Sequence, residues 1–202
     1  MNYQFFAYLS KMRWVFRWGL KRNAIPENVM EHSFEVAVMA HGLAIISRRV
    51  FGQDIDPNQV ATAALFHDAS EALTGDLPSP IKYHNEMIRD AYKGVERVAE
   101  KEMLATLPET LQDDYEALLM HERRDPAINK LVKAADMLAS LVKCKAEVNA
   151  ANREFDKALT TIEARVKELN MPEVEYFCEH FLDSFDLTLD ELIAANLPLH
   201  ID

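Results

Sequence analysis

Four residues of types that bind divalent metal ions are spread along the sequence: His32, the adjacent pair His67 and Asp68, and Asp136. Each lies in an apolar stretch with a helical pattern, where a buried imidazole or carboxylate is costly unless it is paired or binds a metal. Three helices that brought these groups to one point would create a site for one divalent ion. Two histidines and two aspartates would leave coordination positions for water and substrate, as hydrolytic metal chemistry requires.

Each of these residues has a simpler interpretation when it is taken alone. His32 would be a hydrogen-bonded core histidine, and Asp68 a helix-surface aspartate beside His67. Adjacent residues on an α-helix point about 100° apart, so His67 and Asp68 reach one ion together only near a bend or a helix end. Asp136 is harder to explain without a buried partner, because small and apolar residues surround it.

Two further carboxylates follow the His67–Asp68 pair. Glu71 comes four residues after His67 and three after Asp68, so it lies on the same helix face. It could act as general acid and base beside the reacting water, or it could accept a hydrogen bond from a ligand histidine. Asp76 follows in a loop, where it could orient water or the sugar of a substrate.

Positive charge is concentrated near the N-terminus, where Arg17, Lys21 and Arg22 lie among aromatic residues. The planar guanidinium of Arg17 suits phosphate oxygens, and the adjacent Trp18 could hold the phosphate or the sugar against the metal. Lys21 and Arg22 would add a general positive field. A core tryptophan beside a solvated arginine is the simpler alternative for the first pair.

The elements that must position these residues are predicted to be helices in one all-α domain. Only five glycines occur in 202 residues, and the apolar residues recur at helical spacing. The predicted helices cover residues 5–18, 29–51, 57–73, 85–107, 108–121, 126–149, 152–169, 172–185 and a short segment after 188. Residues 74–80 form the clearest loop, directly after Glu71, and could line the same pocket.

Several residues signal where these helices begin. The start signals are Asn28, Asp56 with Pro57, Asp125 with Pro126, Asn170, and the capping box of Thr188 and Glu191. On the helix over 29–51, the apolar positions Phe34, Val38, Leu43, Ile45 and Ile46 are expected to pack against several neighbours.

Composition narrows the class of protein. The net charge of −11 disfavours binding to nucleic acid polymers or to anionic membranes, while a small anionic substrate stays compatible with the local positive charge. No run of 18 apolar residues predicts a membrane span, and no signal peptide is apparent. Cys144 and Cys178 are expected to be reduced thiols in a cytoplasmic protein.

The combination of motifs is far more specific than any one residue. The order His, His-Asp, Asp on successive helices resembles the HD-domain metal-dependent phosphohydrolases. Within that superfamily the chain resembles the bacterial 5′-deoxynucleotidase branch, the YfbR type, over about its whole length. The matching segments are Arg17–Trp18, Glu31–Ser33, Phe66–Glu71, Thr74–Pro78 and Lys133–Asp136.

The resemblance implies an all-α, single-domain HD bundle over residues 1–202 that hydrolyses deoxyribonucleoside 5′-monophosphates. It implies one divalent metal per chain, with cobalt or manganese favoured and zinc, copper or magnesium compatible. The implied metal ligands are His32, His67, Asp68 and Asp136. The implied catalytic residues are Glu71 and Asp76. The implied substrate contacts are Arg17, Trp18, His32, Asp68, Asp76, Leu77, Pro78, Ser79 and Asp136.

A homodimer is also implied by the resemblance. The sequence supports a dimer only through the aromatic residues Tyr176, Phe177, Phe181 and Phe185, which could equally belong to the core. Selection of deoxyribose would come from the loop over 76–79, whose rigid proline would leave no room for a 2′-hydroxyl.

Two alternatives remain. One is another HD-type hydrolase that acts on a triphosphate or a cyclic phosphodiester, which would need more basic residues near the site. The other is a metal- or nucleotide-binding module without activity, although such a module would have no use for Glu71.

Overall fold

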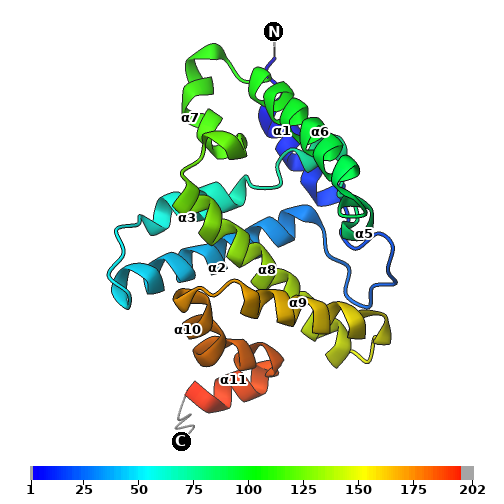
Figure 1. The fold of residues 1–202 in the computed structure, drawn as a ribbon, viewed down its shortest axis with the longest axis vertical. Coiled ribbons are helices and arrows are strands. Elements are labelled where there is room, and N and C mark those ends of the chain that lie inside the picture. Colours follow the sequence, from blue (N-terminus) through cyan, green and yellow to red (C-terminus); the bar gives the residue numbers. More distant parts are fainter. Residues whose placement is uncertain (1, 197–202) are drawn as a thin grey trace, which may run out of the picture.

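A computed structural model describes residues 2–196, and over this range the chain forms helices joined by turns and loops, with one isolated β-bridge between Phe16 and Asn28. This confirms the predicted all-α class (Figure 1). Met1 and residues 197–202, which the expected domain over 1–202 includes, lie outside the described residues. The α-helices are α1 (Phe5–Leu9), α2 (Val29–Arg49), α3 (Pro57–Leu65), α4 (Glu71–Thr74), α5 (Ser79–Lys82), α6 (Glu86–Ala105), α7 (Glu109–Leu119), α8 (Pro126–Asn149), α9 (Asp156–Glu168), α10 (Pro172–Phe181) and α11 (Leu189–Asn196). Short 3₁₀ helices are η1 (Ser10–Trp14), η2 (His121–Arg123), η3 (Arg153–Phe155) and η4 (Leu182–Asp186).

The main core surrounds α2, which packs against α3, α8 and α10. Side chains without exposed surface, such as Leu43 on α2, Val60 on α3 and Leu138 on α8, fill the space between these helices. A second, smaller core lies in the upper part of Figure 1, where α1, α6 and α7 meet the turn that follows α3. The candidate site residues come from the helices and turns between these two cores.

The predicted start signals work as expected at four helices. The side chain of Asn28 accepts a hydrogen bond from the amide of Glu31, and Asp56 and Asp125 cap helices whose first residue is proline. Thr188 and Glu191 form the expected capping box. These caps satisfy amides that a helix leaves unpaired at its N-terminus.

Other expected elements are wrong in detail. The helix expected over 5–18 is instead the short α1 followed by η1, and the helix expected over 57–73 stops at Leu65 and resumes at Glu71. The helix expected to reach residue 185 ends at Phe181 and continues as η4. Asn170 adopts a left-handed backbone with φ of 48°, and Met171 occupies the N-cap position of α10 instead.

Helix α2 is also the one described helix that is long and apolar enough to cross a membrane, judged by length and composition alone. Its residues Val36, Ala40 and Leu43 are fully buried inside the protein, which is the usual state of a central core helix. The expected packing of this helix is only partly correct: Leu43 and Ile46 are buried, whereas Phe34, Val38 and Ile45 are exposed.

Cys144 and Cys178 are free thiols.

Candidate metal and phosphate site

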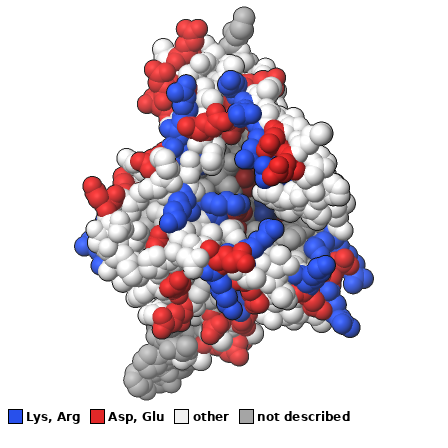
Figure 2. Space-filling view, in the orientation of Figure 1, with Lys and Arg blue, Asp and Glu red and all other residues white. Residues whose placement is uncertain are grey.

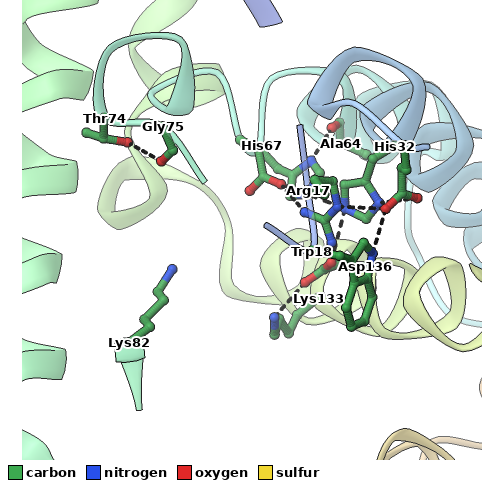
Figure 3. Close-up of polar contacts among 12 residues, drawn as sticks. Arg17, Trp18, His32, Ala64, His67, Thr74, Gly75, Lys82, Lys133 and Asp136 are labelled. Atoms are coloured by element: carbon green, nitrogen blue, oxygen red, sulfur yellow. Dashed lines mark hydrogen bonds and ion pairs between the residues drawn. The ribbon is translucent and has the colours of Figure 1, made fainter. Parts of the chain in front are cut away.

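The four expected metal ligands come from three separate elements and meet at one place (Figure 3). His32 lies in the first turn of α2, His67 and Asp68 lie in the turn between α3 and α4, and Asp136 lies in α8. Ligand atoms of His32, His67 and Asp68 all lie within 4.8 Å of one another. Asp136 joins them through its Oδ1, which lies 3.2 Å from His32 Nε2.

The adjacent pair can act together because the chain leaves the α-helix just before it. After Leu65 the amides of Phe66 and His67 bond to carbonyls three residues back, which tightens the chain into turns. As a result His67 Nε2 and Asp68 Oδ2 lie 3.1 Å apart, although an α-helix would point the two side chains in different directions. The ring of Phe66 stacks on Phe5 in the second core and so fixes this turn.

The donor atoms fit a divalent metal. The Nδ1 of His67 lies 2.7 Å from the carbonyl oxygen of Ala64, so it donates there and leaves Nε2 with a free lone pair. Both ring nitrogens of His32 and Nε2 of His67 are buried without a hydrogen-bond partner among the described residues. Unpaired buried nitrogens are costly, and a shared cation would satisfy the Nε2 atoms of His32 and His67. Two imidazoles with carboxylates form a donor set that suits zinc, cobalt or manganese.

The charges at this cluster are strongly coupled. Burial favours the neutral carboxyl, but the nearby His67 and His32 outweigh it and hold the pKa of Asp68 below its usual range. Asp136 behaves likewise, because Lys133 and His32 outweigh burial and lower its pKa. Burial lowers the pKa of His67, but Asp68 outweighs this and raises it. Both aspartates are therefore held as anions, the form that binds a cation.

Arg17 and Trp18 lie beside the cluster. The Nη1 of Arg17 is 3.5 Å from Asp68 Oδ2, and its Nε donates to Glu27 Oε2 at 3.1 Å. The indole Nε1 of Trp18 donates to the same oxygen at 2.9 Å. Charges of Asp68 and Asp136 outweigh burial and raise the pKa of Arg17, which stays a cation. A guanidinium held beside a group of metal-ligand side chains is suited to bind a phosphate group.

Glu71 and Asp76 both lie near the cluster. Glu71 begins α4 and is buried, and burial together with Asp68 and Asp76 raises its pKa to about 10. Its Oε2 has no hydrogen-bond partner among the described residues. Burial raises the pKa of Asp76 too, against Arg17 and a backbone hydrogen bond from Trp18. A carboxyl held neutral in a buried site can donate and accept a proton, as acid and base catalysis requires.

The loop after Glu71 is tied to α6. The Tyr92 hydroxyl donates to the carbonyl of Gly75, whose φ of 72° allows the sharp turn there. Lys82 reaches the same helix through an ion pair with Glu96 at 2.7 Å. Leu77 and Pro78, which follow Asp76 in the chain, are half-buried, and the exposed Ser79 begins α5. Their contact with substrate stays a prediction.

The surface over this region carries mixed charge. Figure 2 shows a hollow near the middle of the face, with Lys and Arg side chains along it and acidic atoms inside. In a chain with a net charge of −11, this concentrates positive charge where a small anion would enter.

Comparison with known proteins decides the family. The model of the YfbR-like 5′-deoxynucleotidases matches residues 4–185. The chain belongs to the YfbR-like 5′-deoxynucleotidase family. A 5′-deoxynucleotidase of Shewanella oneidensis is 45% identical over 187 residues, covering 93% of this chain and 96% of the relative. One of Cronobacter sakazakii is 44% identical over 195 residues, covering 96% and 98%.

Solved structures confirm the HD fold of this YfbR-like chain. An HD-domain phosphohydrolase of Listeria innocua superposes with a TM-score of 0.76 at 24% identity, covering 90% of this chain and 88% of that one. The HD phosphohydrolase DatZ of cyanophage S-2L, solved with dA and one catalytic Zn²⁺ ion, gives a TM-score of 0.67 at 17% identity, covering 88% and 96%. The predicted resemblance and the hydrolase class are thus confirmed.

Three residues that shape the site of this YfbR-like protein were given no role in it by the sequence analysis. Glu27 holds both Arg17 and Trp18, and Lys133 lies 2.6 Å from Asp136 Oδ2. Glu147 is fully buried and accepts hydrogen bonds from the amides of Ala24 and Ile25. The spacing between partners is irregular except in two ion pairs, Lys133 with Asp136 at i,i+3 and Lys143 with Glu147 at i,i+4, whose helical spacing could have indicated them.

Proposed function

We propose that this protein removes phosphate from deoxyribonucleoside 5′-monophosphates with the help of one divalent metal ion. The observation that carries the proposal is the convergence of His32, His67, Asp68 and Asp136 at one point, with the guanidinium of Arg17 next to Asp68. The names of the relatives, which are 5′-deoxynucleotidases over nearly their full length, support the same substrate class.

His32, His67, Asp68 and Asp136 would hold the metal. When bound, the ion would supply a Lewis acid for a phosphate oxygen and would lower the pKa of a water molecule. Cobalt or manganese is the proposed ion, although the same donors also suit zinc. The solved neighbour that contains a catalytic Zn²⁺ supports a metal of this kind.

The remaining residues would bind substrate and move the proton. Arg17 would bind the phosphate and offset the negative charge that develops on it. Water would attack phosphorus as the bond from phosphorus to the 5′-oxygen breaks, and the neutral Glu71 would donate its proton to the leaving oxygen and take up the proton of the attacking water. Asp76, which accepts a backbone hydrogen bond from Trp18, would orient the water or the sugar.

Trp18 and the residues Asp76, Leu77, Pro78 and Ser79 would surround the sugar. Selection against ribose would be steric, because a wall that leaves no space at the 2′ position penalises the extra hydroxyl. The loop is suited to this role because Tyr92 and Lys82 fasten both of its ends to α6.

A cytoplasmic homodimer is the proposed state of the protein. The exposed side chains of Phe34, Val38 and Ile45 lie along one face of α2 and are apolar, which suits burial against a second copy. Of the aromatic residues expected to support a dimer, Phe177 is buried in the core, whereas Phe181 and Phe185 are exposed. Val38→Glu should convert the dimer to monomers in sedimentation analysis, and an unchanged dimer would exclude this face.

The function is tested by product formation from dAMP, AMP, dATP and a cyclic dinucleotide, separated by chromatography. Protein stripped with EDTA is assayed alone and with Co²⁺ or Mn²⁺. Metal-dependent conversion of dAMP, with little of AMP, is expected. Turnover of dATP or of the cyclic substrate instead would move the enzyme to another HD hydrolase class. Metal binding without any turnover would indicate a binding module.

A further inference from the structure

One buried carboxylate, that of Glu27, faces both halves of the candidate site. Its Oε2 accepts hydrogen bonds from Arg17 Nε at 3.1 Å and from Trp18 Nε1 at 2.9 Å. Its other oxygen, Oε1, lies 3.8 Å from Nδ1 of His32. Glu27 is therefore next to the proposed phosphate and sugar contacts on one side and to a proposed metal ligand on the other.

The backbone places Glu27 in this position firmly. Phe16 and Asn28 form the isolated antiparallel bridge, the amide of Arg17 donates to the carbonyl of Glu27, and the amide of Val29 donates to the carbonyl of Val15. These bonds join the segment that carries Arg17 to the start of α2, which carries His32. Because both segments are fixed, the Glu27 side chain has little freedom to leave the site.

The open side of His32 matches this arrangement. Its Nδ1 is buried and has no hydrogen-bond partner among the described residues, and Glu27 Oε1 lies next to it. A histidine that binds a metal through one nitrogen usually donates the other N–H to a carboxylate, which fixes the ring. Closing the 3.8 Å gap by about 1 Å would bring these atoms to hydrogen-bond distance.

Trp18 needs the support that Glu27 gives. Its backbone has a φ of 61°, a left-handed conformation that is strained for a bulky residue. The indole is held by the Glu27 hydrogen bond and by the ring of Phe155, whose centroid lies 5.2 Å away. A shift of the Glu27 carboxylate toward His32 would therefore alter the environment of this indole.

We propose that Glu27 is a positioning residue that links metal binding at His32 to the placement of Arg17 and Trp18. The bound metal would orient His32, His32 would draw in Glu27 Oε1, and Glu27 Oε2 would hold the Arg17 guanidinium and the Trp18 indole for the substrate. The inference rests on the proposed function through the metal site. A carboxylate that only stabilised the fold would not change its contacts when the metal binds.

The test uses two metal titrations without substrate. The chain has two tryptophans, Trp14 and Trp18, so a Trp14→Phe background makes Trp18 the sole indole emitter. Zn²⁺, which has no unpaired electrons, is titrated while Trp18 emission is recorded, and Mn²⁺ affinity is measured by calorimetry. Glu27→Gln removes the charge with little change of shape. Glu154→Gln is the matched control, because Glu154 contacts this segment through its backbone carbonyl and its side chain is exposed.

Zn²⁺ is expected to change Trp18 emission in the background protein and in the Glu154→Gln control. Glu27→Gln should abolish that change and weaken Mn²⁺ binding about 10- to 100-fold. Metal affinity within threefold of the background, with an intact Trp18 response, would overturn the inference. If Glu27→Gln does not fold, Glu27→Asp is tested by the same two titrations. Its shorter carboxylate cannot reach both His32 and the Arg17 and Trp18 donors. Failure of the parent protein to bind any divalent metal would instead overturn the proposed function.

Discussion

Asp136 uses its two oxygens for two different partners: Oδ1 lies 3.2 Å from His32 Nε2, and Oδ2 lies 2.6 Å from Lys133 Nζ. Lys133 is one turn earlier on α8, and most of its side chain is exposed. An exposed cation thus neutralises a proposed metal ligand from the solvent side. A divalent ion would compete with it for the same carboxylate.

Lys133→Met should therefore tighten Mn²⁺ binding about two- to fivefold, the range expected for loss of one exposed ion pair. Calorimetry on protein stripped of metal measures the effect. Lys130→Met removes the same charge from an exposed position on α8 and should leave the affinity unchanged. Weaker Mn²⁺ binding in Lys133→Met would show that the ammonium supports the site rather than competing with the ion.

Replacement of Glu71 by glutamine should lower kcat about 10²- to 10⁴-fold, the usual contribution of a positioned acid and base. The amide keeps the shape of the buried side chain, so Mn²⁺ affinity should stay within threefold of that of the wild type. Steady-state kinetics with dAMP measure kcat, and calorimetry measures affinity. Glu102→Gln, at an exposed position on α6, is the control for the charge change. A normal kcat in Glu71→Gln would indicate that Asp76, rather than Glu71, is the acid and base.

Metal should also stabilise the protein against heat. Mn²⁺ at one hundred times its Kd should add about 2.7 kcal/mol and raise Tm by about 5–10 °C for a chain of this size. His67→Ala should remove the shift, whereas His41→Ala, further along α2, should retain it. Differential scanning calorimetry measures the shift in Tm. An equal shift in His67→Ala would show that the ion binds elsewhere.

Glu147 should make stability depend on acid pH. Burial opposes its ionisation, but hydrogen bonds from Lys143, Asn152 and the amides of Ala24 and Ile25 outweigh it and lower the pKa to about 2. The folded pKa lies below the ordinary value of 4.5, so this contribution is fully present above pH 4.5 and is lost as pH falls toward about 2.

Glu147→Gln should cost about 3–5 kcal/mol at neutral pH, because the buried Lys143 loses its counter-charge. Urea unfolding from pH 7 down to pH 3 should show the difference between wild type and variant shrinking below pH 4.5. A constant difference over that range would exclude the carboxylate as its source. The exposed Glu154→Gln serves as control.

Local signals were sufficient for much of the fold. Asp125 and Pro126 start α8, and its end at Asn149 also agrees with the pattern of apolar residues. The break after Leu65 could not be predicted in the same way, because the helical pattern continues through it. Phe66 turns out of the helix to pack on Phe5 and Tyr115, which are distant in sequence, and tertiary packing overrides local preference there.

In the candidate site, too, some residues could be predicted from the sequence and others could not. The four ligand-type residues could be singled out because metal chemistry restricts residue type. Glu27 could not, since its partners Arg17, Trp18 and His32 follow no helical or strand spacing and meet it only across a loop. The left-handed backbone of Trp18 was also beyond prediction, because tryptophan rarely adopts it.

The wide spacing of the proposed ligands has a mechanical consequence. An ion held by His32, the His67–Asp68 pair and Asp136 would act as a cross-link that closes two long loops of the chain, as a disulfide does in a secreted protein. It would tie the start of α2, the turn after α3 and the middle of α8 into one unit. Loss of the ion should therefore loosen these three segments together, and amide hydrogen exchange should rise in all three at once.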